Sequence, residues 1–80
     1  MSKARAVVDV IARALAGRPE SVHVEEYDRR GQTILELTMA PGELGRVIGR
    51  QGRTAAAVRT LASAAGELEG LKIAVDFLDD

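Results

Sequence analysis

The segment from Leu44 to Thr54 constrains the fold most, because glycines interrupt one helical pattern there and a second helical pattern follows. The segment contains three glycines, three arginines and no acidic residue, in a chain of net charge −1. Gly49 and Gly52 bracket two polar residues and form a Gly-x-x-Gly loop. Glycine lets a bulky group approach the main chain closely. The arginines indicate that this group is phosphate.

The composition favours one small domain, which we assign to residues 1–80, with no cysteine for a disulfide or a thiolate metal site. Four arginines between Leu44 and Thr60 carry four positive charges, which leaves the rest of the chain with a net charge of −5. Such a local positive field steers a polyanion to one place. The chain has no apolar run of membrane-spanning length and no signal-peptide pattern. We therefore expect a cytoplasmic protein that does not associate with membranes.

The spacing of apolar residues predicts six elements in the order α-β-β-α-α-β. Ser2 is the predicted N-cap of the first helix. The predicted helices cover residues 3–16, a short segment that begins at Pro41 and contains Leu44, Val47 and Ile48, and residues 53–65. The predicted strands cover residues 21–27, 33–40 and 71–77.

These elements predict an α+β fold. A polar turn at residues 28–32 joins the first two strands into an antiparallel hairpin. A right-handed crossover through the next two helices makes the second and last strands parallel. Each strand has one apolar face, so we expect a three-stranded mixed sheet with three helices packed on one face. The apolar stripe predicted for the last helix consists of Val58, Leu61, Ala62 and Ala65.

A Gly-x-x-Gly loop alone is weak evidence for binding, because turns between helices often need glycine for geometry only. Two other phosphate motifs do not fit. The dinucleotide fingerprint needs a third glycine after a strand, and the Walker loop needs a glycine at Val47 and a lysine at Arg53. His23 is the single histidine, so we expect no metal site, no cofactor and no catalytic constellation.

The sequence Val47-Ile48-Gly49-Arg50-Gln51-Gly52-Arg53 resembles the signature loop of KH domains, which grip about four single-stranded nucleotides. The element order resembles the type II (bacterial) KH arrangement. The chain length, the Arg18-Pro19-Glu20 and Ala40-Pro41 segments and the last strand resemble the small stand-alone bacterial KH proteins of the KhpA family. The resemblance implies a single-stranded RNA-binding protein that acts as an RNA chaperone and post-transcriptional regulator. It also links the chain to cell elongation, cell-shape control and cell wall biogenesis.

Carried over to this chain, the resemblance implies an RNA site in the glycine-arginine segment. Gly49 and Gly52 would let the RNA backbone approach the main chain. Arg50, Gln51 and Arg53 would contact phosphates. The apolar residues before the loop, Leu44, Val47 and Ile48, would line the groove that holds the bases. The full predicted site is Leu44, Arg46, Val47, Ile48, Gly49, Arg50, Gln51, Gly52, Arg53 and Thr54. Tyr27 and Phe77 are the only aromatic residues, and both are distant from the loop in the sequence. We therefore expect little base stacking and low sequence specificity.

A second function remains open at this point. The resemblance also implies a homodimer or a heterodimer with a larger KH-containing partner, and a small core with an alanine-rich helix favours self-association. In this alternative the chain is a protein-interaction scaffold, and the loop with its helices forms the partner surface. Competition between RNA and a partner for the region from Gly49 to Gly52 distinguishes the two functions. An enzyme is the least favoured class.

Overall fold

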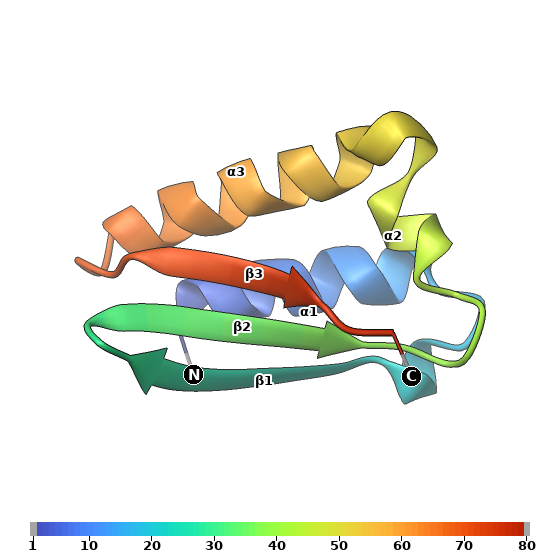
Figure 1. The fold of residues 1–80 in the computed structure, drawn as a ribbon, viewed down its shortest axis with the longest axis horizontal. Helices are drawn as coiled ribbons and strands as arrows, with labels where there is room; N and C mark the ends of the chain where they lie inside the picture. Colours follow the sequence, from blue (N-terminus) through green and yellow to red (C-terminus); the bar gives the residue numbers. More distant parts are fainter. Residues whose placement is uncertain (1, 80) are drawn as a thin grey trace.

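The computed structural model of the chain describes residues 2–79 and confirms the predicted α+β fold class and element order. Asp80, which the sequence places in a polar C-terminal end, lies outside the described residues. Strands β1 and β2 pair antiparallel, and β2 and β3 pair parallel, in the order β1-β2-β3 (Figure 1). The elements are α1 (Lys3–Leu15), β1 (His23–Arg29), β2 (Gln32–Thr38), α2 (Gly45–Ile48), α3 (Arg53–Glu67) and β3 (Ile73–Phe77), with 3₁₀ turns at Pro19–Ser21 and Arg50–Gly52.

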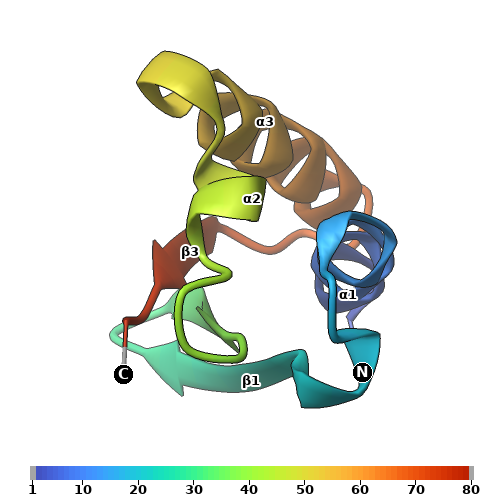
Figure 2. The same cartoon turned by 90° about the vertical axis from the view of Figure 1, so that its right-hand side faces the viewer.

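The three helices lie on one face of the sheet, with α1 on the β1 side and α3 on the β3 side (Figure 2). Fully buried alanines on α1 and α3, among them Ala4, Ala12 and Ala62, add little volume and let the two helices approach each other. The predicted apolar strand faces contribute to this core. The buried cluster is Ala4, Val8, Ala12, Val22, Val24, Leu35, Leu37, Met39, Val47, Val58, Ala62 and Val75.

The start of α1 is tied to β1 through one pair of side chains, and the predicted N-cap is confirmed. The Ser2 hydroxyl accepts a hydrogen bond from the Arg5 amide at 3.0 Å. The same hydroxyl donates to Glu26 Oε1 at 2.7 Å, and the Ser2 amide donates to that oxygen at 3.2 Å. The hydroxyl bond is the main reason why the pKa of Glu26 lies below its ordinary value. Glu26 therefore holds the beginning of the helix against the sheet.

The hairpin turn is shorter than predicted. Arg30 and Gly31 alone connect β1 to β2, and both have positive φ angles, of 52° and 82°. A two-residue turn of this kind has a twist that matches the flanking strands, so Asp28 and Arg29 stay paired with β2. The predicted five-residue turn is wrong for this reason.

Helix α2 begins later than predicted. Its first residue is Gly45, whereas the sequence pattern placed the start of the helix at Pro41. Gly42 has a φ angle of +83°, which no right-handed helix accommodates. The chain therefore turns after Pro41 before the helix can start. The other boundaries agree with the prediction or differ from it by one or two residues, which is the usual uncertainty of such boundaries.

The predicted apolar stripe of α3 is wrong at one position. Leu61 is 53% exposed, and the fully or nearly buried residues of the helix are Ala55, Val58, Ala62 and Gly66. Gly66 faces β3 so closely that a Cβ there would overlap the side chain of Ile73. This close approach sets the rotation of the helix and turns Leu61 toward solvent.

Candidate nucleic-acid interface

The Gly-x-x-Gly loop has an unusual backbone that exposes its tip. Helix α2 ends where the Gly49 amide donates to the Gly45 carbonyl at 2.9 Å. The φ angles of Gly49, Gln51 and Gly52 are +74°, +57° and +72°. A left-handed conformation costs about 1–2 kcal/mol in a residue with a side chain, so Gln51 is strained. Such strain is concentrated at ligand clamps and switch regions.

The two loop glycines are required for different physical reasons. A Cβ on Gly49 would overlap the side chain of Thr54, because the Cβ–Cβ distance would be only 2.8 Å. A Cβ on Gly52 would have no atom within 4 Å. Gly49 therefore permits close packing of the loop, whereas the surface at Gly52 is open to an approaching group.

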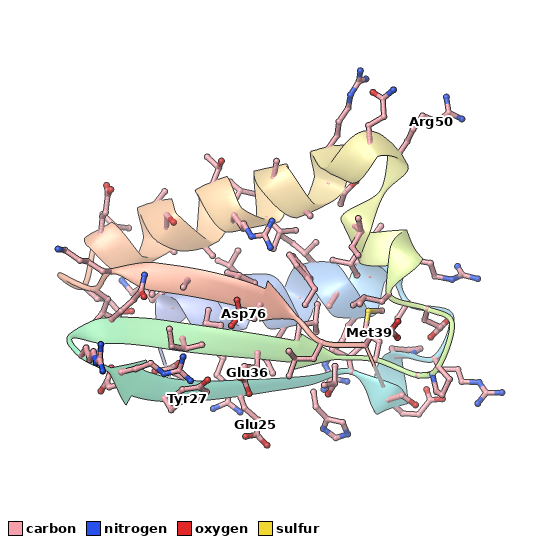
Figure 3. The ribbon with its side chains drawn as sticks, in the orientation of Figure 1. Glu25, Tyr27, Glu36, Met39, Arg50 and Asp76 are labelled. Atoms are coloured by element: carbon pink, nitrogen blue, oxygen red, sulfur yellow. The ribbon has the colours of Figure 1, made fainter. Side chains whose placement is uncertain are left out.

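Positive charge gathers at this opening. Gly52 is the N-cap of α3, and the first turn of α3 has no side-chain cap and no acidic residue. Arg50 and Arg53 are exposed, and Figure 3 shows Arg50 pointing away from the body of the protein. Within residues 2–79, neither arginine has a carboxylate within 4.0 Å. The positive end of the helix dipole and two uncompensated guanidinium groups favour a bound anion here.

Arg46 differs from Arg50 and Arg53 because it is already paired with a carboxylate. Its Nε lies 3.3 Å from Glu43 Oε2. The Glu43 carboxylate also accepts hydrogen bonds from the amides of Gly17 at 2.8 Å and Arg18 at 2.9 Å. Glu43 thus links the segment before α2 to the residues that follow α1, and this link stabilises the position of α2 ahead of the loop. This role of Glu43 was not predicted from the sequence, although Glu43 is the one acidic residue beside the basic segment.

The apolar residues assigned to a base groove are buried to different degrees. Val47 is 1% exposed and packs in the core, where it supports the loop without presenting a surface to a nucleotide. Leu44 and Ile48 are half-buried and keep some accessible surface. Thr54 is also half-buried and packs against Gly49. Of the predicted site, the exposed residues are Arg46, Arg50, Gln51 and Arg53.

The structure brings an aromatic ring toward the same end of the molecule as the loop. Strand β3 ends on the side where α2 ends and α3 begins (Figure 1). Phe77 is its last residue, and the guanidinium carbon of Arg59 lies 4.8 Å from the centre of the Phe77 ring. Arg59 Nε also donates to the Val75 carbonyl at 3.2 Å. The contact between Arg59 and Phe77 was not predicted, because the two residues are far apart in the sequence.

The open face of the sheet carries the opposite charge. The strand register places Glu25, Glu36 and Asp76 in one row across β1, β2 and β3 (Figure 3). Tyr27 donates a hydrogen bond to Glu36 Oε2 at 2.7 Å, and this bond raises the pKa of Tyr27. A row of carboxylates disfavours a polyanion on this face. In residues 2–79 no group of acidic or histidine side chains has metal-binding geometry, and no helix there has the length and hydrophobicity to cross a membrane.

Comparison with known proteins agrees with this architecture. The family model for the KhpA/KhpB KH domain matches residues 5–77. The chain is 43% identical over 72 residues to the RNA-binding protein KhpA of Clostridium perfringens (strain 13 / Type A), covering 90% of this chain and 96% of that protein. It is 35% identical over 79 residues to the RNA-binding protein KhpA of Aquifex aeolicus (strain VF5), covering 99% and 100%. No solved structure gives a significant match.

The family match also bears on the class of function. Its residues, 5–77, span all three strands, α2, α3 and most of α1, and they include the Gly-x-x-Gly loop. The matched family is a KH domain and the relatives are named RNA-binding proteins, in agreement with the expectation that the chain is not an enzyme. The chain belongs to the KhpA/KhpB KH-domain family.

Proposed function

We propose that the chain binds single-stranded RNA by gripping the phosphate backbone with the loop from Gly49 to Gly52. The observation that carries this proposal is the left-handed loop in front of the uncapped start of α3. The loop is flanked by Arg50 and Arg53, which have no carboxylate partner among residues 2–79. The relatives from Clostridium perfringens and Aquifex aeolicus are both named RNA-binding proteins, which supports the same ligand. The row of carboxylates on the open face of the sheet disfavours RNA there, which supports binding on the side of the molecule that carries the loop.

The mechanism uses backbone contact and charge. A phosphate occupies the open space at Gly52, where the first amides of α3 point toward it. Arg50, Gln51 and Arg53 donate to its oxygens and to those of the neighbouring phosphates. Leu44 and Ile48 contact the bases beside this phosphate track. Because phosphates carry no sequence information, the grip is strong on the backbone and weak on base identity.

The decisive experiment replaces the two loop-tip residues with acids. The double variant Arg50→Asp and Gln51→Asp reverses the charge where phosphate is held, and it is measured by fluorescence anisotropy with labelled single-stranded RNA. The matched control changes Arg30→Asp and Gln32→Asp, an equal charge change at the exposed hairpin turn. We expect the loop variant to lose binding and the control to keep it, with circular dichroism unchanged in both. Unaltered binding by the loop variant would refute the assignment.

The resemblance to the KhpA family also motivates a proposal for the cellular role. We propose that the chain acts in the cytoplasm as an RNA chaperone and post-transcriptional regulator that influences cell elongation, cell shape and cell wall biogenesis. A strain that lacks the gene is complemented with the wild type, with the Arg50→Asp and Gln51→Asp variant, or with the hairpin control. Cell length restored by the wild type and the control, but not by the loop variant, supports a role through RNA. Restoration by all three contradicts it.

A second proposed function is protein association, as a homodimer or with a larger KH-containing partner. It is supported by Leu61 on α3 and by Leu68 directly after this helix, which are 53% and 79% exposed. Leu61→Asp should dissociate the assembly in analytical ultracentrifugation and leave the circular dichroism spectrum unchanged. RNA that displaces the partner would indicate a shared surface at the loop, and simultaneous binding would indicate separate surfaces.

A further inference from the structure

A guanidinium plane is held between α3 and the edge strand β3. Arg59 Nε donates to the Val75 carbonyl at 3.2 Å, and the guanidinium carbon lies 4.8 Å from the centre of the Phe77 ring. Phe77 is half-buried and Arg59 is exposed. The plane is therefore anchored from two sides and remains accessible to solvent.

A comparison with Arg13 shows that this arrangement differs from an ordinary support of a strand edge. At the opposite edge of the sheet, Arg13 donates to the carbonyls of Pro19 at 2.8 Å and Val22 at 3.2 Å. Arg13 is also paired with Asp9 through contacts of 3.0 and 3.1 Å. In residues 2–79, no carboxylate lies within 4.0 Å of the Arg59 guanidinium. Arg13 therefore has a carboxylate partner, whereas Arg59 has none in this part of the chain.

The surroundings of Arg59 leave room for a flat group. A shallow open trough on α3 is lined by the small side chains Thr60, Ser63 and Ala64, with Arg59 and Glu67 at its ends. Arg59 lies six residues after Arg53, which is about 9 Å along the helix axis from the start of α3. A strand whose phosphate is held at the loop can therefore bring a neighbouring nucleotide to this place.

We propose that Arg59 is a stacking platform for one unstacked RNA base, with Phe77 as the support beneath the guanidinium. This inference rests on the proposed RNA-binding function and goes beyond it. Guanidinium planes stack on aromatic rings and on bases, so the order Phe77, Arg59, base is physically favoured. The platform supplies the stacking that the loop itself lacks.

The test separates the plane of Arg59 from its charge. Arg59→Lys keeps the charge and removes the plane, and Arg13→Lys is the same substitution at the opposite edge of the sheet. Binding is measured by anisotropy with a labelled RNA of about eight nucleotides, twice the length that a KH loop grips. A set of RNAs, each with one base removed and its sugar-phosphate kept, is measured in parallel.

If Arg59 stacks on one base, the effects of Arg59→Lys and of removing that base on RNA affinity should not be additive. Arg59→Lys should weaken binding of intact RNA about 5- to 150-fold, the range for losing one stacked base. Removal of one particular base should weaken the wild type by a similar factor and should not weaken Arg59→Lys further. The salt dependence should stay unchanged in Arg59→Lys, and Arg13→Lys should bind like the wild type.

Other outcomes overturn the proposal. Normal binding by Arg59→Lys, with a salt slope reduced by about 0.7 in Arg59→Gln, would make Arg59 a phosphate contact. A lower melting temperature in Arg59→Lys with unchanged affinity would make it a structural support. If loop-dependent binding persists without coupling to any base, only the platform fails. If the wild type binds no RNA, the proposed function fails as well.

Discussion

Thr54 packs directly against the α-carbon of Gly49, and this contact closes the turn between α2 and α3. A Cβ added to Gly49 would lie 2.8 Å from the Thr54 Cβ, closer than packed carbon atoms allow. The open surface at Gly52, three residues later, follows from this closure.

Gly49→Ala should destabilise the protein more than Gly52→Ala. Both substitutions place a side chain at a positive φ angle, which costs about 1–2 kcal/mol. Gly49→Ala adds an overlap with Thr54, for which overpacking costs of about 1–3 kcal/mol are typical. Urea unfolding should give the larger loss of unfolding free energy for Gly49→Ala. Equal losses would show that the loop relaxes around the added methyl group.

The dependence of RNA binding on salt should identify the phosphate contacts. About three contacts to a single strand give a slope of log K against log salt near −2, because each contact contributes about −0.7. Arg53→Gln should reduce this slope by about one contact. Arg46→Gln should change the slope less, because Glu43 already compensates part of the Arg46 charge at 3.3 Å. A larger effect of Arg46→Gln than of Arg53→Gln in titrations across salt concentrations would contradict this ranking.

Neutralising the acidic row should stabilise the fold without weakening RNA binding. Glu25 lies directly opposite Glu36 in the antiparallel pair, and like charges in this position are destabilising. Glu25→Gln should raise the free energy of unfolding by about 0.2–1 kcal/mol, the range for cross-strand pairs. RNA affinity should stay equal or rise, because the open face repels phosphate. A marked loss of affinity would place the RNA on the sheet.

Acid should weaken the contact between Ser2 and Glu26. The pKa of Glu26 is lowered in the folded protein, so the carboxylate form stabilises the fold above its ordinary pKa of 4.5. This contribution is lost as the pH falls through the lowered value and the carboxylate takes up a proton. Ser2→Ala should cost about 1 kcal/mol near neutral pH through the lost helix cap, and less under acid conditions. Urea unfolding between pH 7 and pH 3, about the range in which carboxyl groups titrate, measures the difference. Parallel pH profiles for the two proteins would contradict this role for Glu26.

The sequence alone determined the elements, because strand and helix patterns depend on local spacing. Alternation in Leu35 and Leu37 predicts a strand with one buried face, and the spacing of Val58 and Ala62 predicts a helix with one buried stripe. The order of these elements then restricts the connections to one hairpin and one right-handed crossover. The position of the Gly-x-x-Gly loop follows directly. The assignment of nucleotide contacts to that loop remains a prediction.

Only the tertiary structure decided how distant segments meet. The contacts of Glu43 with Gly17 and Arg18 depend on the packing of α1 against the α2 region, and no local pattern encodes them. The placement of Arg59 over Phe77 depends on the rotation of α3 and the end of β3. Leu61 became exposed for the same reason, because the small residues of α3 set its closest approach to the sheet. Local spacing determines which face of an element is apolar, whereas side-chain volumes across the core determine which residues finally meet.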